Sequence, residues 1–242
     1  MTRPFLPMTR LLAAALLASA VAAGPAFAQQ QAAPMDVSPP PGVADAQPAA
    51  ANRGVPVAKL DPTQRATLSR VNTYFNALQQ MTAKFVQVGP DGQRTTGTLW
   101  MDRPGKIRFQ YDSPSPLEII ADGNSVVVRN RRLNTQDMYP LSQTPLRFLL
   151  QSKVDLLGDA NVLGVFQEPE LVSVILEEKR SIGGRAQLQL MFGGADYQLQ
   201  QWTVTDAQGM ETSVALSNVD TSAKPDPRIF RINRQGVARP PK

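Results

Sequence analysis

The chain has 242 residues, with 25 basic and 20 acidic side chains, and it contains no cysteine and no histidine. Without cysteine there is no disulfide, no thiolate catalysis and no lipid-bearing N-terminal cysteine; without histidine there is no Ser-His-Asp triad. The basic residues are not interleaved with stacking aromatic side chains, so nucleic acid is not an expected partner.

The start of the chain has the order of parts typical of a secretory signal peptide. Arg3 and Arg10 make the first residues basic, residues 11–23 are apolar, and residues 26–28 read Ala-Phe-Ala. The apolar run is shorter than the roughly 20 residues needed to span a bilayer. We therefore expect residues 1–28 to be a signal peptide that is cleaved after Ala28.

Residues 29–58 are rich in Gln, Ala and Pro and contain no aromatic residue. Such a segment buries too little apolar surface to offset the entropy lost on ordering, which predicts a disordered spacer. A single folded domain is then expected over residues 59–235, followed by a loose tail over residues 236–242.

The domain is predicted to begin with an amphipathic helix. Asp61 followed by Pro62 is typical of a helix N-terminus. Apolar residues then recur at helical spacing for about five turns, and they are Leu68, Val71, Tyr74, Phe75 and Leu78.

After Met81 the apolar pattern changes to a period of two, which indicates strands. Strands are predicted at 85–88, 95–101, 107–111, 117–121, 126–128, 133–139, near 162, and at 171–176, 186–192, 199–205, 210–216 and 229–232. Short turns rich in Gly, Pro and Asp separate them. The pattern favours an antiparallel meander of about eleven strands, which we expect to curl.

Two short helical segments interrupt the strands. Thr144-Pro145 opens one that holds Leu146, Phe148, Leu149 and Leu150, and a second covers residues 154–157 and ends at Gly158. Because they are too short to form a domain, we expect them to pack over the open mouth of the curled sheet.

One basic group stands out in a predicted hairpin, and it consists of Arg129, Arg131 and Arg132. Two interpretations stay open. The group is either a solvated turn or a docking patch for an acidic partner or for lipid head groups.

Several segments together resemble a known family. They are residues 71–78, 83–87, 97–111 (Gly-Thr-Leu-Trp-Met-Asp-Arg-Pro-Gly-Lys-Ile-Arg-Phe-Gln-Tyr) and 119–123, with Thr144-Pro145-Leu146 and the region of Phe230. This set resembles the LolA-type outer-membrane lipoprotein carriers over roughly residues 60–234. The run from residue 97 to residue 123 is the specific part.

The resemblance implies a half-open antiparallel β-barrel closed by helices. It also implies a periplasmic protein that takes acylated lipoproteins from an inner-membrane ATP-driven transporter, shields their acyl chains and delivers them to the outer membrane. A receptor at the outer membrane is left open, and we assume a monomer. Arg103 lies at the family's Arg-Pro turn, whose arginine holds the lid. Ile107 stands where the family often has an aromatic residue near the transporter contact.

Alternation of apolar residues predicts the binding surface. From the pattern alone a packed, dry core is favoured, whereas the resemblance favours a cavity that is left vacant for lipid. The expected lining residues are Phe85, Leu99, Met101, Ile107, Phe109, Tyr111, Leu117, Ile119, Leu146, Phe148, Leu149 and Leu150, with Arg103 as the lid latch. Three long acyl chains, at about 0.8 kcal/mol per CH₂, would gain roughly 35 kcal/mol on full burial. Since binding saturates near 18–21 kcal/mol, we expect lid-opposed binding and an external energy source for loading.

Two alternatives remain at this point. One is a periplasmic sensor or protein-binding module of related β-fold that carries no lipid. The other is a hydrolase that pairs Asp102 with Asp112 or Glu118 as catalytic carboxylates. The missing histidine makes catalysis the weaker prediction, and neither a metal nor a cofactor is expected.

Overall fold

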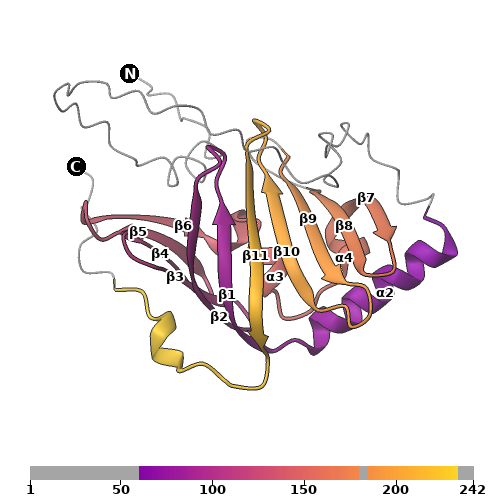
Figure 1. The fold of residues 1–242 in the computed structure, drawn as a ribbon, viewed down its shortest axis with the longest axis horizontal. Helices are drawn as coiled ribbons and strands as arrows, with labels where there is room; N and C mark the ends of the chain where they lie inside the picture. The colour runs from indigo at the N-terminus through magenta and orange to yellow at the C-terminus, as the bar shows by residue number, and fades with distance from the viewer. Residues whose placement is uncertain (1–59, 180–184, 234–242) are drawn as a thin grey trace, which may run out of the picture.

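The computed structural model describes residues 60–179 and 185–233 (Figure 1). The predicted signal peptide (1–28), the predicted spacer (29–58) and the predicted loose tail (236–242) lie outside the described residues. Within the described ranges, no helix combines the length and the apolar character that a membrane-spanning helix requires.

The first element is helix α2, Pro62–Ala77, and it begins where the sequence predicts. The Asp61 carboxylate accepts a hydrogen bond from the Gln64 backbone N–H at 2.8 Å, and the Gln64 side chain accepts one from the Asp61 backbone N–H at 3.1 Å. This reciprocal arrangement is a capping box, which satisfies two N–H groups that the helix leaves unpaired. Val71 and Phe75 are buried on the face that meets the sheet.

Within the part of the chain that the structure describes, eleven strands form one antiparallel sheet, which confirms the predicted fold class. They are β1 Gln80–Val88, β2 Arg94–Asp102, β3 Lys106–Tyr111, β4 Leu117–Asp122, β5 Ser125–Asn130, β6 Thr135–Pro140, β7 Ala160–Gln167, β8 Leu171–Glu178, β9 Gln187–Gly193, β10 Leu199–Thr205 and β11 Glu211–Asp220. Their order is β6-β5-β4-β3-β2-β1-β11-β10-β9-β8-β7. Strand β1 joins the two halves because it pairs with both β2 and β11. The sheet ends at β6 and β7, so it curls without closing (Figure 1).

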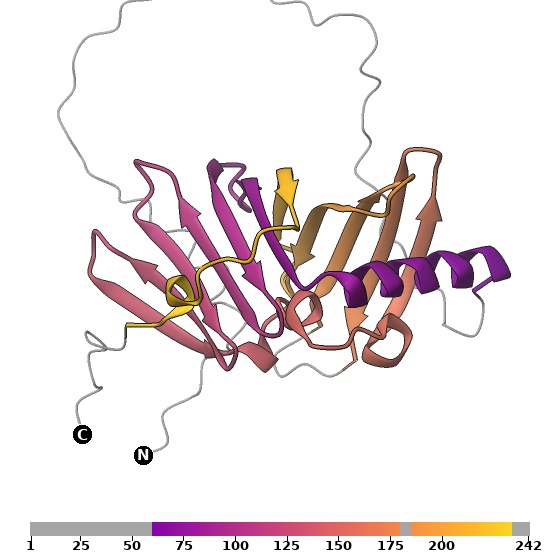
Figure 2. The ribbon, with the colours of Figure 1, turned by 90° about the horizontal axis from the view of Figure 1, so that it is seen from below.

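The connection from β6 to β7 carries the predicted short helices. It contains the 3-10 helix η2 (Leu141–Gln143), α3 (Arg147–Leu150) and α4 (Leu156–Asp159). Figure 2 shows α2 and this connection on the same side of the sheet, which we call the inner face. The β7 edge is partly covered by α2, because the Gln64 side-chain amide donates to the Val165 carbonyl at 3.2 Å.

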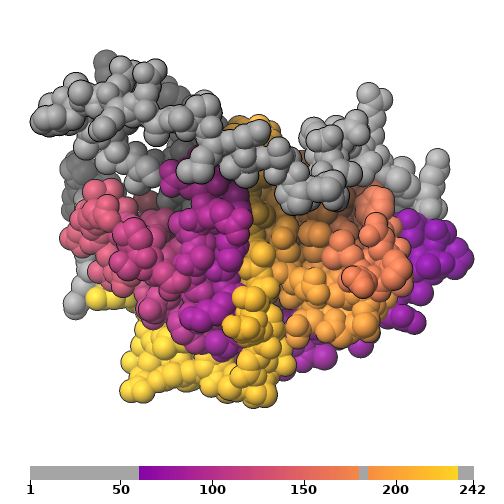
Figure 3. All heavy atoms as spheres, viewed as in Figure 1, coloured from indigo at the N-terminus to yellow at the C-terminus, as the bar shows by residue number. Residues whose placement is uncertain are grey.

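The predicted last strand at 229–232 is wrong. The segment forms the 3-10 helix η3, Pro227–Phe230, whose N-terminus is capped by the Asp226 carboxylate. Arg108 Nη1 donates to the Ile229 carbonyl at 2.9 Å, and Phe230 is buried. The apolar residues here pack on the outer face of β3 and β4 instead of pairing with a strand. Figure 2 shows the segment crossing those strands, and Figure 3 shows the same face with the C-terminal residues, in yellow, packed against its lower part.

Gly97 in β2 is required by the packing between the first strands. A Cβ atom there would lie 2.2 Å from the Gln110 carbonyl oxygen and 2.7 Å from the Phe85 ring. We expect Gly97→Ala to lower the free energy of unfolding by about 3 kcal/mol, because backbone and a buried ring must both shift. Urea denaturation measures the loss.

Gly164→Ala in β7 is the matched control. Its Cβ would meet only the Phe166 ring, which is exposed and free to turn away. We expect a loss below about 1 kcal/mol. Equal losses in the two variants would contradict the packing argument.

Candidate functional site

The strand register brings the predicted apolar residues together on the inner face. Leu99 in β2 lies opposite Phe109 in β3, which in turn lies opposite Ile119 in β4. Nine of the predicted residues are buried there in one cluster, namely Phe85, Leu99, Met101, Ile107, Phe109, Tyr111, Phe148, Leu149 and Leu150, while Leu117, Ile119 and Leu146 are partly buried against it. The short helices therefore do face the predicted strand residues.

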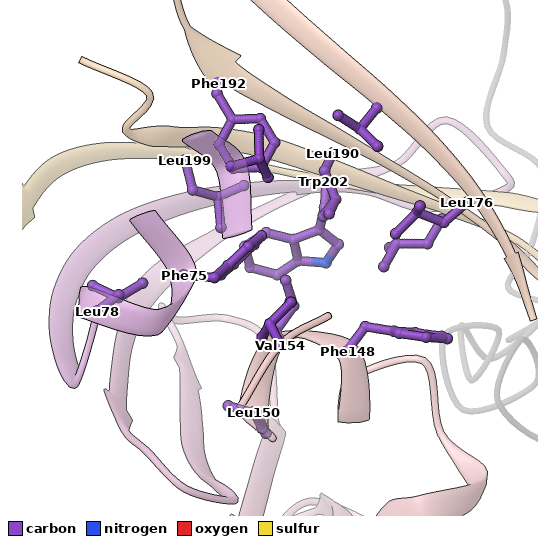
Figure 4. Close-up of a cluster of buried hydrophobic side chains, with 14 of the residues drawn as sticks. Phe75, Leu78, Phe148, Leu150, Val154, Leu176, Leu190, Phe192, Leu199 and Trp202 are labelled. Carbon is purple, nitrogen blue, oxygen red and sulfur yellow. The ribbon is translucent and has the colours of Figure 1, made fainter. Parts of the chain in front are cut away.

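The second half of the sheet contributes as much to this face as the first, which the sequence interpretation missed. Trp202 in β10 lies at the centre of the cluster, with Phe75, Leu190 and Leu199 around it (Figure 4). Its ring centroid is 6.2 Å from that of Phe109 in β3, so the two halves of the sheet meet here. The alternation of Leu188, Leu190 and Phe192 is the sequence signal that would have found this half.

The resemblance favours a cavity left vacant for lipid, but in this conformation the side chains of the helices fill the inner face formed by the described strands. Phe148 and Leu150 of α3 and Val154 of the α3–α4 connection are buried in the same cluster as Trp202 (Figure 4). An apolar ligand that binds the strand residues must therefore displace these side chains. The strands form the face, and the helices cover it.

Arg103 joins the sheet to both helices that cover it. Only 6% of its surface is exposed. Its guanidinium makes four hydrogen bonds to three main-chain carbonyls, those of Phe75 and Leu78 at the end of α2 and that of Gln151 at the end of α3. The bond from Nη1 to Leu78 is 2.8 Å long, and the bond from Nε to Gln151 is 3.2 Å long.

The chemistry of these acceptors explains why an arginine is held there. The last carbonyls of a helix lack intrahelical partners and form the negative end of its dipole, so a cation is favoured beside them. Burial lowers the pKa of the Arg103 guanidinium from its ordinary value. The group still carries its charge at neutral pH, because that ordinary value lies far above 7. The four hydrogen bonds offset the cost of burying it.

A second polar contact on the inner face lies at the other end of β3. The Tyr111 hydroxyl donates to the Gln87 side-chain oxygen at 2.7 Å, and both residues are buried. Burial raises the pKa of the Tyr111 hydroxyl, so it remains a neutral donor. This pair satisfies its own polar atoms and leaves the surrounding face apolar.

Two asparagines of α2 also hold the connection between α3 and α4, and the sequence interpretation did not single them out. The Asn76 side chain donates to the Val154 carbonyl at 3.0 Å and accepts from the Val154 N–H at 2.9 Å. The Asn72 side-chain oxygen accepts from the Leu156 N–H at 3.2 Å. Asparagine is a poor helix former. Two asparagines four residues apart on one face of a predicted helix are therefore the sequence signal that would have identified Asn72 and Asn76.

Replacing Asn76 with alanine is expected to loosen this connection. The change removes two hydrogen bonds to one residue, which are together worth about 2 kcal/mol. Amide hydrogen exchange at Val154 should therefore speed up by more than tenfold while exchange in β1 to β3 stays the same. Thr73→Ala is the control, because Thr73 bonds only within α2, to the Ser69 carbonyl. Equal acceleration in both variants would contradict the assignment.

The structure separates the carboxylates that the hydrolase alternative needs. Asp102 lies opposite Lys106 at one end of β3, whereas Asp112 follows the other end, about 20 Å away at roughly 3.3 Å per strand residue. Glu118 lies opposite Gln110 and is ion-paired with Arg108. Neither pair has the separation of about 5 to 9.5 Å that glycoside hydrolysis requires.

A hollow of about 360 Å³ lies elsewhere, along β9, β10 and β11. It shares none of the predicted lining residues; Met191, Gln200, Gln201 and Ser217 are among its walls. It forms where the pairing of β9 with β10 shifts register between Leu199 and Gln201. Its mixed amide and apolar lining indicates no particular ligand.

Comparisons with known proteins match the family that the sequence resembles. The model of the family described as outer membrane lipoprotein carrier protein LolA matches residues 76–233, more than half of the chain. The outer-membrane lipoprotein carrier protein of Leptothrix cholodnii is 27% identical over 165 residues, which cover 64% of this chain and 76% of that protein. The carrier protein of Pseudomonas aeruginosa is 25% identical over 174 residues, which cover 68% and 82%.

Solved structures were also matched. A conserved protein of Thermus thermophilus covers 72% of this chain and 96% of its own, with a TM-score of 0.43 and 14% identity. A chain of the MucA/MucB complex of Pseudomonas aeruginosa covers 69% of this chain and 60% of its own, with a TM-score of 0.39 and 14% identity.

Proposed function

Because the chain belongs to the LolA family of outer-membrane lipoprotein carrier proteins, we propose that it shields the acyl chains of lipoproteins in the periplasm and moves them from the inner to the outer membrane. The observation that carries the proposal is an apolar inner face on an open sheet, covered by α2 and by two helices of only four residues each. The predicted signal peptide is consistent with the periplasmic location.

The acyl chains would take the place that the short helices now occupy. Phe148, Leu150 and Val154 cover the strand residues with the same aliphatic and aromatic chemistry that an acyl chain offers. Helices this short have no stability of their own, so they stay closed only through tertiary contacts. Opening therefore costs the burial of these side chains and the bonds that Arg103 makes to the helix ends.

Arg103 is the proposed latch of this lid. Its bonds to the ends of α2 and α3 are made only while both helices are seated on the sheet. Entry of an acyl chain displaces α3 and breaks the bonds to Gln151, so lipid binding and latch closure compete. The competition lowers the affinity for cargo and allows release.

The same competition explains the proposed partners. Loading works against the latch and against the buried side chains of the lid, so it needs an external energy source, which an inner-membrane ATP-driven transporter supplies. Release recovers the closed state and proceeds downhill once an acceptor for the acyl chains, such as the outer membrane or a receptor in it, is present.

Mass spectrometry of co-purifying material tests the proposal. The full chain is expressed with its own N-terminal segment in a bacterium with two membranes and is isolated from the periplasm. We expect enrichment of triacylated proteins, and loss of each one when its lipid-bearing cysteine is replaced by serine. Capture of one partner that lacks acylation, with no enrichment of acylated proteins, would contradict the carrier and support the protein-binding alternative.

A further inference from the structure

The turn between β5 and β6 consists of Arg131, Arg132, Leu133 and Asn134, and the structure holds it in one shape. The buried side chain of Asn130 accepts hydrogen bonds from the backbone N–H groups of Arg132 and Leu133, at 3.0 and 3.1 Å. The Arg131 N–H donates to the Pro116 carbonyl of the neighbouring turn at 3.0 Å. The turn is therefore preorganised.

This fixed turn presents an apolar side chain directly after two basic residues. Leu133 is 58% exposed, more than any other large hydrophobic side chain among the described residues. Arg131 and Arg132 precede it and are both exposed, and Arg129 is half-buried two residues before Arg131. One nitrogen of the Arg132 guanidinium donates to the Pro114 carbonyl at 3.2 Å. Two acidic residues lie on the neighbouring segments. Asp112, in the turn between β3 and β4, accepts a hydrogen bond from Thr96 Oγ1 at 2.7 Å. Asp137 lies further along β6, opposite Val128. The end of the turn is thus positively charged with an apolar apex.

We propose that this turn contacts the surface of a membrane that contains anionic phospholipid, with Leu133 entering the interface and Arg131 and Arg132 binding phosphate groups. Basic residues near an anionic surface and an exposed apolar residue beside them are the two contributions that hold a peripheral protein on a bilayer. The turn lies at the free end of the sheet's edge hairpin (Figure 1), so a flat surface can approach it. The inference goes beyond carrying lipoproteins, and it would give the carrier a direct contact with the membrane.

Vesicle flotation with cargo-free protein tests the charge requirement. The protein should float with vesicles of phosphatidylcholine and phosphatidylglycerol and not with phosphatidylcholine alone, and binding should fall as salt screens the charges. Arg131→Gln with Arg132→Gln should weaken binding by roughly thirtyfold, since each basic residue contributes about fivefold. The proposal would be overturned if the double variant bound as tightly as the unaltered protein. It would also be overturned if the unaltered protein did not bind the anionic vesicles, and an acidic protein would then become the candidate partner.

A fluorescent label tests which residue enters the interface. The chain has no cysteine, so Leu133→Cys carries an environment-sensitive dye at one position. Its emission should shift to the blue on anionic vesicles. Met210→Cys is the matched control, because Met210 is 40% exposed beside the turn between β10 and β11, where Asp206 and Glu211 are the neighbouring charges. A shift of equal size at both positions would overturn the proposed contact. Because no cargo is present, failure here leaves the carrier function untouched.

Discussion

Replacing Arg103 with leucine is expected to leave cargo uptake intact and to slow its release by roughly a hundredfold. The change removes all four guanidinium bonds to the ends of α2 and α3. Each hydrogen bond to a charged group contributes about 1.5–3 kcal/mol, but leucine also removes the cost of several kcal/mol for burying the guanidinium. The closed state therefore loses a net free energy of roughly 3 kcal/mol. Because closure opposes binding, that loss appears as tighter retention of the acyl chains.

Release of a triacylated lipopeptide from the protein into phospholipid vesicles measures the effect. Arg108→Gln is the control, because Arg108 is also a partly buried arginine of the same hairpin but bonds Glu118 and Ile229 on the outer face. Its release rate should match that of the unaltered protein. The latch is contradicted if both variants release slowly, or if Arg103→Leu releases at the normal rate.

The fold was predictable where its signals are local. Asp61, Pro62 and the apolar spacing that follows them determine α2 within a few residues, and most strands are joined by short turns that the sequence marks. The prediction of the last strand was wrong because a short apolar run indicates only that its residues are buried. It does not indicate which part of the protein they pack against. Whether Ile229 and Phe230 pair with a strand or pack on one depends on β3 and β4, more than a hundred residues earlier.

The site was predictable only in part for the same reason. Parity along β2 and β3 placed Leu99 and Phe109 on one face, and the register confirms this. The acceptors of Arg103 lie 25, 28 and 48 positions away in the chain, and Asn76 bonds a residue 78 positions away. Such contacts arise from the way the β6–β7 connection folds back over the sheet. No spacing in the sequence encodes them, so the role of Arg103 came from the family resemblance, whereas Asn76 was missed.

The proposed carrier function requires the lid to move aside, so a covalent lock on the lid is expected to abolish uptake of acyl chains. Asn72 and Asn76 of α2 bond Leu156 and Val154, the residues on either side of Asp155. Cysteines introduced at Thr73, between the two asparagines, and at Asp155 are therefore within reach of a short bis-thiol cross-linker. They would be the only thiols in the protein.

The decisive measurement is the binding of a triacylated lipopeptide to the Thr73→Cys, Asp155→Cys variant before and after cross-linking. The same protein without the cross-link is the control, so any effect of the substitutions cancels. We expect cross-linking to lower the affinity by at least tenfold, because the inner face stays covered by Phe148, Leu150 and Val154. Unchanged binding by the locked protein would contradict the claim that these helices must move for lipid to enter.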